Sequence, residues 1–192
     1  CEVWLHGERV THLSQHARVK RGLARTFQIN TLFPALTPLE AVVLAVCERK
    51  GVAARWHRTV AGMRDEVDEA RGILASLRLE RDADTPTAQL AYGRQRLLEI
   101  GLALATRPKL LLLDEPAAGI PTTESADLFE VIARLPADVT ILFIEHDMDL
   151  VFRFAARITV LVGGRILTEG TPAEIAAHPR VKEVYLGEAQ HG

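Results

Sequence analysis

The hydrophobic positions of this chain follow two different periods, and the change between them falls near Pro108. From Leu39 to Leu104 the apolar residues recur at the three-to-four-residue spacing of amphipathic helices. After Pro108, short apolar runs alternate with helical stretches, and the run Leu110–Leu113 suits a parallel strand that is buried on both faces. The pattern therefore predicts an α/β fold that carries a helical subdomain.

Turn and capping residues divide this pattern into separate elements. The Gly163-Gly164 pair predicts a β-hairpin between two apolar runs, and Ser14 predicts the start of a short basic helix. We expect strands at 1–5, 8–11, 23–28, 110–113, 139–144, 158–162 and 165–168. We expect helices at 15–22, 39–48, 59–79, 123–135, 148–156, 172–178 and 181–186, with loops at 30–38 and 82–87.

Composition narrows the class of protein only a little. Of the 192 residues, 48% are hydrophobic and 25% are charged, which suits one globular domain with its own core. The net charge of −2 gives no electrostatic case for nucleic acid, so the basic segment from His16 to Arg25 is interpreted as a solvated face. The two cysteines, Cys1 and Cys47, form no disulfide framework and favour a reduced, cytosolic setting. No apolar run is long enough to cross a bilayer, so work at a membrane would require docking onto another protein.

An apolar strand that ends in two carboxylates is the strongest local sign of chemistry. Leu110–Leu113 is followed at once by Asp114 and Glu115, and open α/β sheets bind ligands at the carboxyl ends of their strands. ATP hydrolysis needs one carboxylate in the magnesium shell and one group that orients or deprotonates the attacking water. Adjacent residues at a strand end can divide these two roles. The plainer interpretation is an acidic strand-to-loop junction.

Two polar side chains after other strands fit the same chemistry. His146 follows the strand at 139–144 and can donate a hydrogen bond to a γ-phosphate. Its ordinary interpretation is a helix-entry histidine, with Asp147 as the N-cap of the next helix. Gln28 ends the strand at 23–28 before a loop, and its amide suits water and magnesium, although by itself it is an ordinary polar strand end.

A glycine-bearing turn precedes a helix at Leu90-Ala91-Tyr92-Gly93-Arg94. Backbone N–H groups at such a helix start, together with the helix dipole, can hold a phosphate. A plain helix N-terminus would explain the same residues, since one glycine is weak support in isolation.

Taken together, these motifs resemble the ATPase subunits of ATP-binding cassette (ABC) importers, and in particular the branched-chain amino-acid subgroup. The motifs occur in the family's order over nearly the whole chain. They are GLARTFQ at 22–28 (Q-loop entry), LAYG at 90–93 (signature), LLLLDEPAAG at 110–119 (Walker B and D-loop) and IEHDMDLV at 144–151 (H-loop), with GTPAEI at 170–175 and VYLGE at 184–188 in the C-terminal tail.

The resemblance implies an incomplete ABC-type P-loop NTPase fold, with a mostly parallel core sheet, a helical subdomain and an N-terminal β segment. It implies one N-terminally truncated ABC ATPase domain over 1–192. Within it, 1–28 would be the β segment up to the Q-loop, 39–104 the helical subdomain with the signature motif, and 105–192 the Walker B, D-loop, H-loop and C-terminal part of the core.

The resemblance also implies roles for individual residues toward ATP and Mg²⁺. Asp114 would hold magnesium through water, Glu115 would be the general base and His146 would contact the γ-phosphate. Gln28 would contact magnesium and sense the transporter. The signature residues would cover ATP bound to a second ABC ATPase subunit, in a homo- or heterodimer; these are Ala91, Tyr92, Gly93 and Arg94.

The sequence departs from the family's pattern at several points. No G-x-x-x-x-G-K-[ST] phosphate loop occurs, and none of the four lysines follows a glycine. We expect this loop to precede Cys1, and its strand to lie beside 110–113, which would otherwise be an exposed apolar edge prone to self-association. Arg94 replaces the usual Gln, Leu102 the usual Arg, and Pro121 the usual Asp or Asn of the D-loop.

The resulting hypothesis is the ATP-hydrolysing subunit of an ABC importer. Such a subunit would bind membrane-spanning permease subunits through the region around Gln28 and the segment 39–80, and would be cytoplasmic and peripheral on the inner face of the plasma membrane. Nucleic acid is not an expected partner. Two alternatives stay open: a non-catalytic ABC-like binding or regulatory module, and the ATPase of a lipid or lipopolysaccharide exporter.

Overall fold

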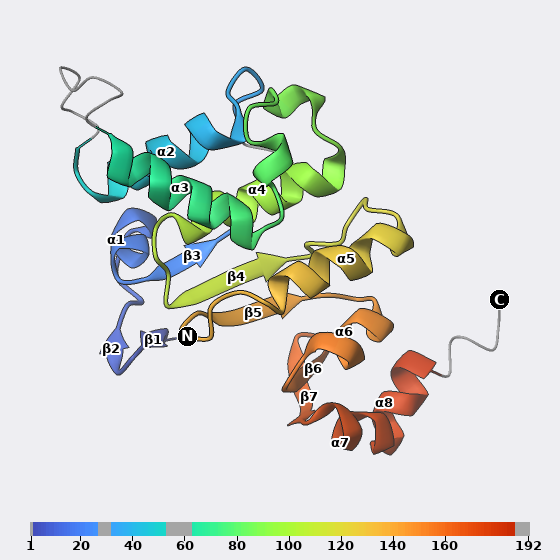
Figure 1. The fold of residues 1–192 in the computed structure, drawn as a ribbon. Coiled ribbons are helices and arrows are strands. Elements are labelled where there is room, and N and C mark those ends of the chain that lie inside the picture. The colour runs from blue at the N-terminus through green and yellow to red at the C-terminus, as the bar shows by residue number, and fades with distance from the viewer. Residues whose placement is uncertain (1, 27–31, 53–62, 187–192) are drawn as a thin grey trace. The chain divides into compact units, whose positions relative to one another are not determined.

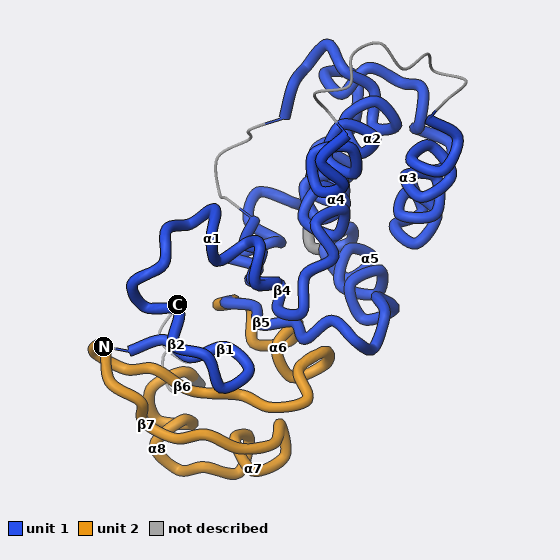
Figure 2. Tube along the Cα trace, turned by 90° about the vertical axis from the view of Figure 1, so that its left-hand side faces the viewer, with its two compact units in different colours: residues 1–144 blue, residues 145–192 orange. Residues whose placement is uncertain are grey.

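The computed structural model describes residues 2–26, 32–52 and 63–186. Its chain forms two compact units, residues 1–144 and 145–192, which are coloured separately in Figure 2. The boundary falls inside the segment 105–192 that the sequence assigns to the second part of the core. Each unit is described by itself below.

A parallel sheet of three strands forms the centre of the first unit, in the order β3-β4-β5 (Figure 1). These strands are β3 (Leu23–Arg25), β4 (Leu110–Asp114) and β5 (Thr140–Ile144). Leu111 of β4 lies opposite Ala24 on one side and Ile141 on the other. Leu111 and Leu113 are fully buried, so the leucine run forms the central strand, as the sequence predicts.

The expected position of the apolar edge was wrong. β4 is hydrogen-bonded on both sides and therefore has no open edge, whereas β5 pairs only with β4 among the described strands. Leu142 and Ile144 of β5 are 56% and 61% exposed. Strand order depends on pairing between distant segments, and the burial pattern of one strand does not specify its neighbours.

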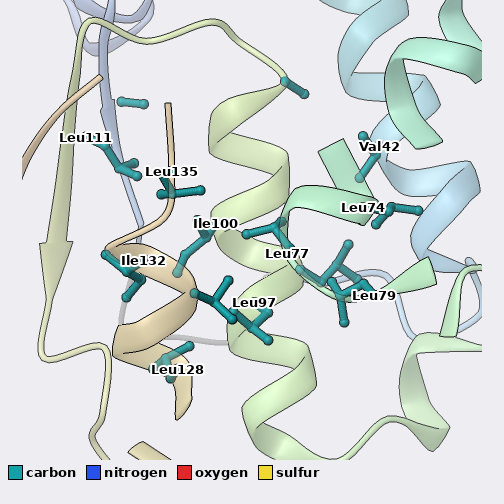
Figure 3. Packing of buried hydrophobic residues seen from close by; sticks show 14 of the residues in the cluster. Val42, Leu74, Leu77, Leu79, Leu97, Ile100, Leu111, Leu128, Ile132 and Leu135 are labelled. Carbon is teal, nitrogen blue, oxygen red and sulfur yellow. The ribbon is translucent and has the colours of Figure 1, made fainter. Parts of the chain in front are cut away.

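Helices α4 (Tyr92–Leu104) and α5 (Thr122–Ile132) pack against each other through a shared apolar core. In Figure 3, Leu97 and Ile100 of α4 face Leu128 and Ile132 of α5, and Leu111 of β4 lies in the same cluster. This packing fixes the start of α4 beside the loop that follows β4, which is where the candidate site lies.

The helical subdomain consists of α2 (Pro38–Arg49), α3 (Arg64–Ser76) and the far side of α4. A capping box starts α2, since Thr37 Oγ1 accepts from the Glu40 N–H and Glu40 Oε2 accepts from the Thr37 N–H. Gly101 lets α4 approach Leu77 closely, because a Cβ at Gly101 would lie 2.9 Å from the Leu77 Cδ1.

The smaller elements of the first unit are shorter than the sequence predicts, as expected for boundaries set by local pairing. The segment 82–87 was expected to be a simple linker, but 3₁₀ turns form at both of its ends. These elements are β1 (Trp4–Leu5), β2 (Glu8–Arg9), α1 (Gln15–Lys20) and 3₁₀ turns at Glu80–Asp82 and Thr87–Gln89.

The second unit holds a β-hairpin and short helices, as the sequence predicts. Strands β6 (Ile158–Val162) and β7 (Arg165–Gly170) pair antiparallel around the Gly163-Gly164 turn, where both glycines have positive φ. Helix α7 begins with a second capping box, at Thr171 and Glu174. The elements are α6 (Met148–Phe154), β6 (Ile158–Val162), β7 (Arg165–Gly170), α7 (Pro172–Ala177), α8 (Pro179–Val181) and a π-helical turn (Lys182–Leu186).

Among the described residues, no helix has both the length and the apolar character needed to cross a membrane.

Candidate nucleotide site

The carboxyl end of the central strand carries the two acidic residues that the sequence singles out. Burial alternates along β4, with Leu111 and Leu113 in the core and Asp114 on the less buried face. The side chain of Asp114 is 25% exposed. This places one carboxylate at the end of the central strand, where it is accessible to a ligand and follows the buried Leu113.

Arg25, the last residue of β3, holds Asp114 in place. Its Nη2 lies 2.9 Å from Asp114 Oδ2, across the pairing that sets Arg25 opposite Leu112. The sequence interpretation of Arg25 as part of a solvated face missed this ion pair, because 89 residues separate the partners. With the Arg25 side chain 53% exposed, the pair contributes only about 0.2–1 kcal/mol, so a cation of higher charge density can compete for Asp114.

Magnesium fits this arrangement only if the phosphates of the nucleotide and water supply most of its ligands. Among the described residues there is no group of three or more His, Cys, Asp or Glu that could hold a metal ion. Mg²⁺ commonly keeps several waters and takes one or two carboxylates together with the phosphates of its substrate. Asp114 suits that mode, since it is one accessible carboxylate and already pairs with the Arg25 guanidinium.

Glu115 turns the chain off the sheet. Its φ is +45°, the left-handed region that non-glycine residues avoid at a cost of about 1–3 kcal/mol. Backbone bonds enforce this conformation: the Glu115 N–H donates to the Ile144 carbonyl at 3.0 Å, and its own carbonyl accepts from the Ala118 N–H at 3.0 Å. Strain of this kind is concentrated at functional sites, and here it falls on the residue that the sequence assigns as the base.

The signature turn forms the start of α4, as the sequence predicts. Ala91 is the N-cap and makes no side-chain capping hydrogen bond, so its side chain leaves the first N–H groups of the helix to other acceptors. Glu124 lies beside this turn, because a Cβ at Gly93 would be 3.4 Å from Glu124 Oε2. Sequence reasoning missed Glu124, since nothing in its spacing marks it.

Arg94 makes contacts within the helical subdomain. Its Nη1 donates to the Arg78 carbonyl at 2.5 Å, and its Nε lies 3.5 Å from Asp82 Oδ2. Arg78 has a positive φ of 57°. Arg94 is part of the signature motif, and its hydrogen bond also stabilises this strained turn.

A cleft of about 290 Å³ lies between the start of α4 and α5. Its lining carries both signs of charge, from Arg78 and Arg94 and from Glu124 and Asp127. The rest of the lining is Gly93 and four apolar residues, which are Ala91, Leu97, Leu128 and Val131.

Tyr92 and two buried charges share one face of α4. The Arg96 Nη2 donates to the Tyr92 hydroxyl at 2.6 Å, and the Arg96 Nη1 lies 2.8 Å from Glu99 Oε2. Burial raises the pKa of Glu99, and the Arg96 guanidinium opposes that rise. Burial lowers the pKa of Arg96, but its contacts with Glu99 prevail and raise it, so the guanidinium stays charged. The signal in the sequence for these contacts is the i, i+3 and i, i+4 spacing of the three residues.

His146 belongs to the second unit, two residues after the end of β5. Its side chain is 78% exposed, and its Nδ1 lies 4.0 Å from Glu145 Oε2. Asp147 caps α6, accepting from the N–H groups of Asp149 and Leu150. The N-cap that the sequence analysis offered as an alternative is therefore present. The predicted phosphate role of His146 stays a prediction, and Gln28 lies outside the described residues.

A central parallel strand that ends in tandem carboxylates, beside a helix start without a side-chain cap, defines the class of an α/β nucleotide-binding protein. Comparison with known proteins identifies the family. The ABC transporter family model matches residues 2–118, and a model described as branched-chain amino acid ATP-binding cassette transporter matches residues 165–191. The chain belongs to the ABC transporter family.

Relatives match along almost the whole chain. The high-affinity branched-chain amino acid transport ATP-binding protein BraF of Pseudomonas aeruginosa is 39% identical, over 96% of this chain and 75% of its own. LivG of Escherichia coli, which carries the same description, is 37% identical over 97% and 76%. A solved ATP-binding cassette of an ABC transporter, in its ADP conformation, superposes with a TM-score of 0.77 at 27% identity, covering 97% of this chain and 76% of the other.

Proposed function

We propose that this chain is the ATP-hydrolysing subunit of an importer for branched-chain amino acids. The observation that carries the proposal is the match to BraF over 96% of the chain, which includes the carboxylate pair at the end of β4. The separate C-terminal match at 165–191 favours amino-acid import over lipid or lipopolysaccharide export. The match to ATP-binding transport proteins across the residues of the carboxylate pair favours an active enzyme over a passive binding module.

In this proposal the subunit binds ATP with Mg²⁺ and works as a dimer. Asp114 would hold the magnesium ion, and the ion would neutralise charge on the phosphates. Glu115 takes the proton of the attacking water, and the N–H groups at Ala91, Tyr92 and Gly93 receive the γ-phosphate of the nucleotide on the second subunit. The predicted roles of Gln28 toward magnesium and of His146 toward the γ-phosphate belong to the same proposal. The segment 39–80 meets the membrane-spanning permease subunits, so the protein is peripheral on the cytoplasmic face of the membrane.

Transport in proteoliposomes tests this function. The native subunit is assembled with its permease subunits and substrate-binding protein, and ATP-dependent uptake of labelled leucine is measured. We expect uptake that Glu115→Gln abolishes and that Asp138→Asn leaves unchanged, since Asp138 is an exposed residue before β5. Hydrolysis without leucine uptake, but with transfer of lipid, would instead support the exporter, and no hydrolysis at all would support the binding module.

A further inference from the structure

Helix α4 buries a pair of opposite charges that the proposed mechanism does not use. Arg96 and Glu99 are each only 8% exposed and meet at 2.8 Å through Arg96 Nη1 and Glu99 Oε2. The other carboxylate oxygen, Glu99 Oε1, is buried and has no hydrogen-bond partner among the residues that the structure describes. A buried ion pair is weak support for stability, because desolvation of both charges offsets their attraction. The pair therefore calls for another explanation.

The pair is connected to the signature turn through Tyr92. The Arg96 Nη2 donates to the Tyr92 hydroxyl at 2.6 Å, and the guanidinium carbon lies 5.0 Å from the centre of the Tyr92 ring. Tyr92, Arg96 and Glu99 occupy positions i, i+4 and i+7, which share one helix face. Glu99 thus fixes Arg96, and Arg96 fixes both the tip and the plane of the Tyr92 ring.

Tyr92 in turn touches the loop that carries Glu115. A Cβ at Gly119 would lie 3.3 Å from Tyr92 Cε1 and 3.8 Å from its hydroxyl oxygen, and Gly119 has a φ of +77°. Between Glu115 and Gly119 the loop is a tight turn, closed by the bond from the Ala118 N–H to the Glu115 carbonyl. The ring therefore rests on backbone that leads within four residues to the proposed base.

We propose that Arg96 and Glu99 are positioning residues that hold the Tyr92 ring against Gly119, so that the signature turn and the Glu115 loop keep one relative geometry. This inference rests on the proposed function, because it assigns a role in ATP hydrolysis to that same site. Neither residue touches nucleotide in this account. A displacement of a reacting group by about 1 Å can lower a rate by about 100-fold. The contacts from Glu99 through Arg96 to Tyr92 are therefore expected to affect kcat.

The test replaces the pair with apolar residues of similar size, Arg96→Met with Glu99→Leu, in the native subunit. Such replacements of buried ion pairs commonly keep the fold. We expect kcat for ATP hydrolysis to fall about 10- to 100-fold, while the KM for ATP changes less than about threefold. The matched control is Arg157→Met with Glu169→Leu, which removes an exposed ion pair on the second unit and leaves both constants unchanged.

Combination with Tyr92→Phe shows whether the pair acts through the tyrosine. That change removes only the hydroxyl that Arg96 holds. If Arg96 and Glu99 act through it, the triple variant is no slower than the Arg96→Met, Glu99→Leu double variant. If the effects of the double variant and of Tyr92→Phe on kcat multiply, the proposal that the pair acts through Tyr92 is overturned. Gly119→Ala perturbs the far end of the contact without touching the buried pair, and we expect it to lower kcat as well.

A structural measurement separates this inference from the proposed function. The native subunit is labelled with fluorotyrosine, and the ¹⁹F resonance of Tyr92 is assigned as the one that Tyr92→Phe removes. We expect the Tyr92 resonance to shift and broaden in the double variant without nucleotide. An unchanged resonance, or a kcat loss that follows only a lower Tm, would overturn the positioning role. A wild-type protein without ATPase activity would overturn the proposed function. The ¹⁹F result would still show whether Arg96 and Glu99 hold the Tyr92 ring.

Discussion

Glu69 of α3 is held by three cationic side chains. Arg49 Nη2 and Arg107 Nη2 lie 2.7 Å and 2.9 Å from its Oε1, and Lys50 Nζ lies 3.3 Å from its Oε2. Burial raises the pKa of Glu69, but hydrogen bonds from Lys50 and Arg107, with the charge of Arg49, prevail and lower it below 4.5. The Glu69 carboxylate therefore ties α2 and α3 to the turn that leads into β4.

Glu69→Gln should destabilise the protein in a pH-dependent way. A lowered carboxyl pKa means that its stabilisation is complete above the unfolded value near 4.5 and is lost as the pH falls through the folded value. We expect a loss of about 1–3 kcal/mol in unfolding free energy at pH 7, which shrinks below pH about 4.5. Urea denaturation across this pH range measures it. Glu48→Gln, at an exposed position of α2, is the control, and equal losses at pH 4 and pH 7 would contradict the account.

At the scale of the element, β4 determines where the chemistry lies. Its leucines alternate between a fully buried face and a partly buried one, so the strand is fixed firmly enough to present Asp114 and Glu115 at one edge of the sheet. β5 has the opposite character, because its exposed face carries Leu142 and Ile144.

The same substitution in these two strands should have different effects. Leu113→Ala removes a side chain that is 1% exposed and should lower the free energy of unfolding by about 2–5 kcal/mol. Leu142→Ala, at 56% exposure, should change it by less than about 1 kcal/mol. Thermal or urea unfolding measures both. Similar losses would show that β5 is covered by other parts of the protein in solution.

The elements that the sequence predicted well are those marked by residues within or next to the element itself. The leucine run predicted β4, Ser14 and Asp147 cap their helices, and Gly163-Gly164 forms the hairpin. The sequence could not show contacts between distant segments, because no local pattern encodes them. The place of β5 at the edge, the Arg25–Asp114 pair and the contact of Tyr92 with Gly119 are of this kind.

For the molecule as a whole, the edge that β5 forms among the described strands has a consequence for assembly. An apolar strand with unpaired backbone groups is a template for pairing with another chain. We therefore expect the 192-residue chain by itself to self-associate through β5. The sequence alone predicts such an edge at 110–113 instead.

Leu142→Lys should reduce this association. A lysine on an edge strand opposes pairing through its charge. Leu44→Lys is a matched control, since Leu44 is 54% exposed but lies on α2. Sedimentation velocity over a range of concentrations measures the effect. A wild-type chain that stays monomeric, or two variants that behave alike, would contradict β5 as the interface.

The central claim is that Glu115 is the base of an ATPase. The most direct test is the rate of ATP hydrolysis by the native subunit and its Glu115→Gln variant, with ATP binding measured in parallel. The account predicts a rate about 10²–10⁴ times lower with binding retained, and no change for Asp138→Asn. A Glu115→Gln protein that hydrolyses ATP at the wild-type rate would contradict it.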